Sequence, residues 1–172
     1  MIKEKKIIYY EILSDLKAKR ILELESGDSN PEIKNFNYYI STDINKEFLK
    51  RIKRSERKEC VLCDCKHLPF KEGSFDLIHV SFPSFAKFSL NGKEIYPTLH
   101  FEHLERSINE IRRVLDRGYF VIFPFYENGE KVSYQRIFWQ QEISYYLKMN
   151  KFKNESKRVW ENVRVEIFKS YS

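Results

Sequence analysis

The sequence predicts an α/β protein with a three-layer, doubly wound, mostly parallel sheet that ends in a C-terminal antiparallel hairpin. Two observations predict this fold. Segments with apolar residues at helical spacing alternate along the chain with short apolar segments typical of buried strands, an order that favours a parallel sheet. Near the C-terminus, apolar and polar residues alternate on both sides of Glu161 and Asn162, which is typical of a hairpin.

We expect helices where apolar residues recur every three or four positions. They are residues 3–17, a segment after Asn45 that carries Phe48, Leu49 and Ile52, residues 102–115 and residues 135–149. We expect Asn45 to cap the second helix and Gly118 to end the third.

Five short apolar segments predict the parallel strands. They are Arg20–Leu24, Tyr38–Thr42, Cys60–Asp64, Phe75–Val80 and Tyr119–Phe125. The hairpin strands are expected at residues 155–160 and 163–168. The connection from Ser29 to Asp43 leaves room for about two helical turns.

Length and composition fit one folded domain over residues 1–172. Hydrophobic residues make up 42% of the chain and aromatic residues 16%, enough for a substantial core. No apolar run approaches the roughly 20 residues of a membrane-spanning helix, so we expect no membrane partner. The first residues mix Lys with Glu and lack a small-residue cleavage site, which favours mature structure over a signal peptide and a cytoplasmic location.

The chain is basic, with a net charge of +6 from 31 Lys and Arg against 25 Asp and Glu. This charge is compatible with a nucleic-acid partner or with a solvated, Lys-rich surface. We favour the solvated surface, because the basic residues are spread along the chain. The densest group is Lys50, Arg51, Lys53, Arg54, Arg57 and Lys58.

Three cysteines lie close together at Cys60, Cys63 and Cys65. Their spacing, followed by His67, is one that metal sites use. On a strand, however, Cys63, Cys65 and His67 would share one face and Cys60 the other. We therefore favour buried structural thiols over a metal site.

Polar residues stand at the carboxyl ends of the predicted strands. In doubly wound sheets the ligand binds outside these ends, at the point where the strand order reverses. Asp43 follows the second strand, where a carboxylate commonly holds a ribose diol. Asp64 ends the third strand, where it can accept a hydrogen bond from an adenine amine. Together these residues predict a nucleoside site.

Four sequence motifs occur in the order in which a known protein family has them. They are Lys19–Leu24 (K-R-I-L-E-L), Thr42–Ile44, the run D-C-K-H-L-P-F from Asp64 followed by S-F-D-L-I from Ser74, and Glu110–Leu115 with Arg117–Ile122. From Lys19 to Phe125 the chain resembles the class I S-adenosylmethionine-dependent methyltransferases, and the small-molecule, type 11-like group most of all.

The resemblance implies a Rossmann-like methyltransferase fold, S-adenosylmethionine as cofactor, S-adenosylhomocysteine as product and a methyl acceptor of unknown identity. The cofactor-binding residues that it implies are Glu23, Gly27, Asp43, Ile44, Asp64, Cys65 and Ser81. It assigns no catalytic residue and no metal ligand. His79, His100 and His103 are candidate bases, although lone histidines on apolar segments are more often structural.

The chain departs from the family in the glycine-rich loop. Where the family has G-x-G-x-G, this chain has Glu25-Ser26-Gly27-Asp28-Ser29. Glu25 would add bulk and a negative charge near the methionine portion of the cofactor, attracting its sulfonium and ammonium groups and repelling its carboxylate. Two hypotheses follow: an active methyltransferase, or a methyltransferase-like domain that has lost turnover and binds a protein or RNA partner. A dinucleotide-binding oxidoreductase is disfavoured, because its G-x-G-x-x-G motif is missing.

Overall fold

The computed structural model describes residues 2–27, 30–81, 88–90, 93–95, 101–126, 145, 147–149, 151–160 and 163–170. Among these residues, three helices and nine strands have defined bounds, and Tyr145 and Leu147–Met149 are also helical. In chain order they are α1 (Ile2–Asp15), β1 (Arg20–Leu24), β2 (Tyr38–Asp43), α2 (Lys46–Leu49), β3 (Lys58–Leu62), β4 (Phe75–Ser81), β5 (Phe88–Leu90), β6 (Lys93–Ile95), α3 (Phe101–Val114), β7 (Leu115–Tyr126), β8 (Phe152–Trp160) and β9 (Val163–Ser170).

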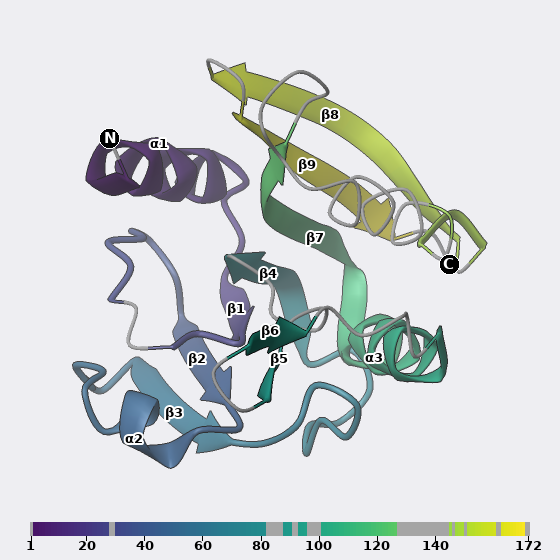
Figure 1. The fold of residues 1–172 in the computed structure, drawn as a ribbon. Coiled ribbons are helices and arrows are strands. Elements are labelled where there is room, and N and C mark those ends of the chain that lie inside the picture. The colour runs from purple at the N-terminus through teal and green to yellow at the C-terminus, as the bar shows by residue number, and fades with distance from the viewer. Residues whose placement is uncertain are drawn as a thin grey trace.

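Seven strands form one sheet in the order β3-β2-β1-β4-β7-β9-β8 (Figure 1). The first five are parallel to their neighbours. Strand β9 runs antiparallel to β7, and β8 antiparallel to β9. The predicted fold, a mostly parallel sheet closed by a C-terminal antiparallel hairpin, is therefore confirmed.

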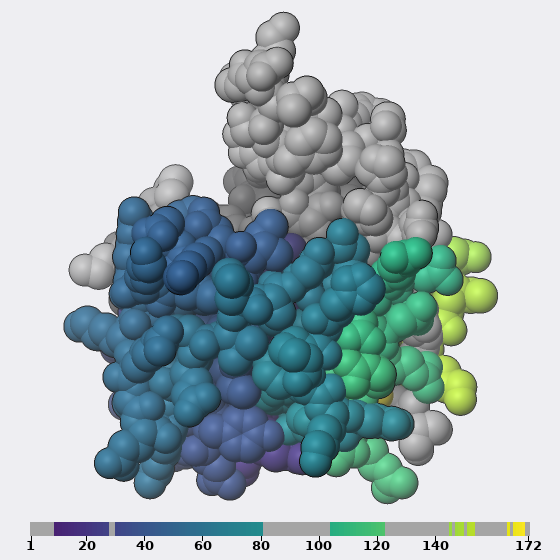
Figure 2. All heavy atoms as spheres, turned by 90° about the horizontal axis from the view of Figure 1, so that it is seen from below, coloured from purple at the N-terminus to yellow at the C-terminus, as the bar shows by residue number. Residues whose placement is uncertain are grey.

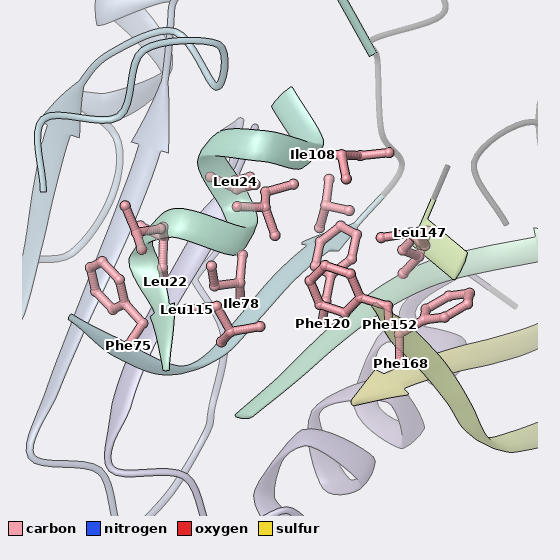
Figure 3. Packing of buried hydrophobic residues seen from close by; sticks show 14 of the residues in the cluster. Leu22, Leu24, Phe75, Ile78, Ile108, Leu115, Phe120, Leu147, Phe152 and Phe168 are labelled. Carbon is pink, nitrogen blue, oxygen red and sulfur yellow. The ribbon is translucent and has the colours of Figure 1, made fainter. Parts of the chain in front are cut away.

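Side chains of the strands alternate between two buried clusters, because successive residues of a strand point to opposite faces of the sheet. On one face, α1 contributes Tyr9, Ile12 and Leu13, which pack with Ile21 and Leu77 among others. On the other face, α3 packs against a second cluster. Its labelled members in Figure 3 include Leu22, Leu24, Ile78, Ile108, Phe120 and Leu147. The sheet is therefore a middle layer, with α1 packed on one face and α3 on the other.

The helices agree with the predictions except at their ends. Helix α1 ends at Asp15 because Lys17 adopts a positive φ of 53°, which turns the chain out of the helix. Asn45 caps α2 as expected, with its side-chain oxygen accepting from the Glu47 amide at 3.0 Å. Helix α2 is only four residues long, and Ile52 lies beyond it. Of the helix predicted at residues 135–149, only Tyr145 and Leu147–Met149 are described, and they are helical.

The prediction that Gly118 ends a helix was wrong. Helix α3 ends at Val114, and Gly118 lies inside β7. A Cβ atom added at Gly118 would stand 1.9 Å from the carbonyl oxygen of Asp76 on β4. The two strands approach so closely here, beside a register shift between Phe75 and Leu77, that only glycine fits.

The third strand is displaced from its predicted place. It covers Lys58–Leu62, so Cys63 and Cys65 lie in the loop that follows and not on alternate faces of a strand. The predicted end of the strand was wrong, because the apolar stretch continues past Leu62, whereas pairing with β2 stops there, opposite Asp43. Residues 30–37 contain no helix, although the sequence leaves room for one.

Two further features lie outside the predicted elements. Residues 88–90 and 93–95 form a small antiparallel hairpin, where the sequence shows no clear period. The C-terminal strands begin earlier and end later than predicted, at Phe152 and Ser170. Within the described part of the chain, no helix is both long and apolar enough to span a membrane.

Candidate functional site

The loop after β1 contains two residues with a left-handed backbone conformation, separated by one residue. Glu25 has a φ of 50° and Gly27 a φ of 58°, both in the left-handed region that favours glycine. Between them, the Ser26 amide donates to the carbonyl of Thr42 at 2.8 Å. The loop thus folds back onto the carboxyl end of β2.

Asp43 joins this loop to the end of β2. Its Oδ2 accepts from the Gly27 amide at 2.9 Å, and its Oδ1 accepts from the Asn45 amide at 2.7 Å. These two bonds fix the carboxylate, while each oxygen keeps a second lone pair for another donor. Beside it, the side chain of Ile44 is 74% exposed, an apolar surface at the edge of the site.

The loop after β3 contacts the end of β2 at its start and α3 further along. At its start, the Cys63 amide donates to the carbonyl of Asp43 at 3.1 Å. Next, the Asp64 Oδ1 accepts from the Lys66 amide at 2.9 Å, and its Oδ2 pairs with the Lys66 ammonium at 3.3 Å. Burial alone would raise the pKa of Asp64, but these contacts with Lys66 outweigh it and lower the pKa, so the group is a carboxylate.

The L-P-F part of this loop is fixed by two residues of α3. Glu110 accepts from the Leu68 amide at 2.8 Å. Arg113 donates to the carbonyls of Leu68 at 2.8 Å and Phe70 at 2.7 Å, and it is paired with Glu110 at 2.7 Å. These bonds attach the loop to the helix, so two motifs that lie about 40 residues apart in the sequence are joined in the structure. In Figure 2 the teal residues of this region lie against green residues of α3 and β7.

Glu25 and Cys65 meet between the two loops. The Oε1 of Glu25 lies 4.0 Å from the Sγ of Cys65, which lies 3.3 Å from the Oγ of Ser107 on α3. Burial, with the charge of Glu25 as a second cause, raises the pKa of Cys65 to about 12. The thiol is therefore neutral and unreactive at ordinary pH.

Glu23 lies away from the other predicted residues. It is fully buried on the face of the sheet that α1 covers, the same face as Ile21. The Ser41 hydroxyl donates to its carboxylate at 2.9 Å, and the Thr42 hydroxyl donates to its carbonyl oxygen at 2.9 Å. The contacts of Glu23 described here hold β1 and β2 together.

His79 belongs to a buried polar cluster that sequence reasoning missed. The Tyr9 hydroxyl lies 3.0 Å from its Nδ1 and the Tyr39 hydroxyl 2.7 Å from its Nε2. All three side chains are buried, and burial together with the charge of Lys58 lowers the pKa of His79 to about 3. A histidine enclosed in this way does not reach a substrate. Alternation along β4 could have placed it on the α1 face, but not beside two tyrosines.

Asp76 of the S-F-D-L-I motif lies at the opposite end of the sheet, where β1 and β4 begin. Its carboxylate accepts from the Arg20 amide at 3.0 Å and from the Arg20 Nε at 2.9 Å. Arg20 also donates to the carbonyl of Gly73 at 2.9 Å. This motif aligns two neighbouring strands and takes no part in the site.

The structure thus brings Gly27 and Asp43 into direct contact and places Ile44, Asp64 and Cys65 on the loops beside them. Ser81 is the last residue of β4, opposite Phe123 of β7. His100, the side chain of His103 and residues 82–87, which directly follow Ser81, lie outside what the structure describes. In the described residues, no group of three or more His, Cys, Asp or Glu side chains is placed to hold a metal ion.

Comparison with known proteins gives one family. A methyltransferase-domain family matches residues 26–123, more than half of the chain. No curated protein matches the chain.

Solved structures share the fold at low sequence identity. The PH0226 protein of Pyrococcus horikoshii OT3 is 15% identical, with a TM-score of 0.70, over 99% of this chain and 91% of that one. The N-methyltransferase NodS of Bradyrhizobium japonicum WM9 is 10% identical, with a TM-score of 0.67, over 99% and 96%. A SAM-dependent methyltransferase of Methanosarcina mazei is 15% identical, with a TM-score of 0.67, over 94% and 98%.

The family match covers the loop after β1 from Ser26 onward and the carboxyl ends of β2 and β4. It also covers the bonds of Glu110 and Arg113 to the L-P-F loop, which we call the clamp. The sheet order and the antiparallel closing strands agree with it. The chain belongs to the methyltransferase-domain family.

Proposed function

We propose that this protein binds S-adenosylmethionine at the carboxyl ends of β1, β2 and β3 and transfers its methyl group to an acceptor. The observation that carries the proposal is the position of Asp43. Its carboxylate is fixed by the Gly27 and Asn45 amides at the end of β2, next to the place where the sheet order reverses between β1 and β4.

The residues present fit the nucleoside part of this cofactor. Asp43 would accept from the ribose hydroxyls, and Ile44, 74% exposed, would lie against the adenine. Asp64, with the backbone of Cys65, would meet the polar edge of the base. At Gly27 an added Cβ would meet no atom within 4 Å, so the loop leaves open space for the rest of the ligand. Glu23 is fully buried and would act indirectly, by holding the ends of β1 and β2 together. Ser81 would act from the end of β4.

When bound, the cofactor supplies an electrophilic methyl group on a positively charged sulfur. The chain's own contribution is to bind and orient, which accelerates a transfer by bringing the reacting atoms together. His79 is excluded as a base toward an acceptor, because it is fully buried between Tyr9 and Tyr39. No observation favours the alternative of a domain without turnover, so we do not propose it.

Isothermal titration calorimetry with S-adenosylmethionine and S-adenosylhomocysteine tests the proposal. Wild-type protein is expected to bind both. Asp43→Asn is expected to weaken both by about tenfold or more, because the amide NH2 donates where one carboxylate oxygen accepts, so a ribose hydroxyl or a backbone amide loses its acceptor. Glu56→Gln is the matched control. Glu56 is exposed before β3, at the amino end of the sheet, and its change should leave the affinities unaltered.

The proposal fails if wild-type protein shows no binding at about 1 mM ligand, a concentration at which even a complex of about −4 kcal/mol is half formed. It fails equally if both ligands bind but Asp43→Asn and Glu56→Gln have the same affinities as wild type. That second result would place the ligand away from the end of β2.

A further inference from the structure

We infer that Glu25 is a specificity-determining residue which makes the site favour a ligand with a positively charged sulfur over its neutral thioether counterpart. In the reaction proposed above, on which this inference rests, these ligands are S-adenosylmethionine and S-adenosylhomocysteine. The carboxylate would thus favour the cofactor over the product that competes with it.

The backbone at Glu25 is the first argument. A side chain at a φ of 50° is strained, and such outliers persist where the surrounding structure holds them. The next residue but one, Gly27, has nearly the same φ of 58° and carries no side chain. A glycine at position 25 would remove the strain without changing the path of the loop. The chain therefore carries a glutamate at a position where the backbone conformation favours glycine.

The order of the strands gives the place of Glu25 along the ligand. Asp43 and Asp64 follow β2 and β3, which lie together at one side of β1. A nucleoside held by those two carboxylates has its base over β2 and β3. The rest of the ligand then extends toward β1 and β4, and Glu25 directly follows β1. The part of the ligand that carries the sulfur is therefore the part nearest to Glu25.

The surroundings of Glu25 are the third argument. The residue is half-buried, and its Oε1 lies 4.0 Å from the Sγ of Cys65, at the junction of the loops that follow β1 and β3. Charges in such partly buried places are screened less by solvent and salt than exposed ones. A sulfonium arriving near this carboxylate is attracted, whereas a thioether is not.

The two ligands separate this effect from all others. Both contain the same adenosine, ammonium and carboxylate groups, and they differ only in the methyl group and the charge on sulfur. The ratio of their dissociation constants therefore reports the interaction with that charge. Other contacts, and any general weakening of the site, cancel in the ratio.

The test compares wild-type protein, Glu25→Gln and Glu25→Gly by calorimetric titration with each ligand at low ionic strength. Glu25→Gln keeps the size of the side chain and removes its charge; Glu25→Gly also removes the backbone strain, so it folds even if the first variant does not. In both, the preference for S-adenosylmethionine over S-adenosylhomocysteine should fall by about tenfold, the effect of one unit charge at several ångströms in a partly solvated site. The exposed Glu56→Gln, which changes the net charge equally, should keep the wild-type ratio.

The ligand-induced rise in unfolding temperature gives a second readout that does not involve turnover. The inference is overturned if either folded Glu25 variant binds both ligands with a ratio within twofold of wild type. Failure of the proposed function looks different, because wild-type protein then binds neither ligand.

Discussion

Lowering the pH from 7 to 5 is expected to destabilise this protein through one buried imidazole. His79 is fully buried against Tyr9 and Tyr39, and burial lowers its pKa from the ordinary 6.5 to about 3. At pH 7 the imidazole is neutral in both the folded and the unfolded chain. As the pH falls through 6.5, the unfolded chain takes up a proton that the folded chain refuses until about pH 3. Stability is therefore present above pH 6.5 and is lost as the pH falls below it.

The magnitude follows from the linkage between protonation and folding. Each pH unit in the window between these pKa values costs about 1.4 kcal/mol of unfolding free energy. From pH 7 to pH 5 the integrated loss is about 2 kcal/mol, a large part of the stability of an ordinary domain. The lowered pKa values of Asp64, Asp76 and Glu110 take effect mainly at lower pH, where carboxylates titrate, so these three groups contribute little between pH 7 and pH 5.

Urea denaturation at pH 7 and pH 5 measures the difference, for wild type and for His79→Gln. The variant is expected to be less stable at both pH values, but to lose about 2 kcal/mol less between them. His67→Gln, a change at an exposed histidine, should behave as wild type. The reasoning is refuted if wild type and His79→Gln lose the same free energy between the two pH values.

Two further variants test the packing that positions the site. Gly118→Ala is expected to lower the free energy of unfolding by about 3 kcal/mol or more, because its Cβ would stand 1.9 Å from a backbone oxygen of Asp76. Gly73→Ala, with no atom nearer than 3.9 Å but a φ of 63°, should lower it by about 1 kcal/mol. Equal losses in urea denaturation would refute the close approach of β4 and β7. Arg113→Ala is expected to cost about 2 kcal/mol, because it removes the ion pair with Glu110 and leaves the carbonyls of Leu68 and Phe70 without this donor. The exposed Arg117→Ala should change stability by less than about 0.5 kcal/mol. A loss for Arg113→Ala no larger than that of its control would show that the clamp is unimportant.

Periodicity predicted the elements that are long or strongly apolar. Strand β1 has the predicted bounds, and β2 and β4 each extend only one residue further. The prediction failed where an apolar residue suits two structures. Leu115 continues the helical period of α3 but begins β7, because pairing opposite Phe75 competes with the helix there. Strand β3 ends early for a similar reason, since its partner β2 ends at Asp43.

The sequence predicted some features of the candidate site and not others. The types of residue at the strand ends, and hence the row of Asp43, Asp64 and Gly27, could be read from the chain. The bond from the Gly27 amide to Asp43 could not, because it depends on how the loop after β1 folds back over β2. Nor could the strained backbone of Glu25, since nothing in its neighbours along the chain requires a positive φ.

By itself, then, the sequence determined the order of helices and strands, the residues at the carboxyl ends and the family to which the chain belongs. Local periodicity and residue type carry that information. Only the tertiary structure decided that β1 lies between β2 and β4, that Glu23 and His79 are buried beneath α1, and that Glu25 meets Cys65. The physical reason is that these contacts join residues far apart in the chain, and the packing of the whole sheet selects them.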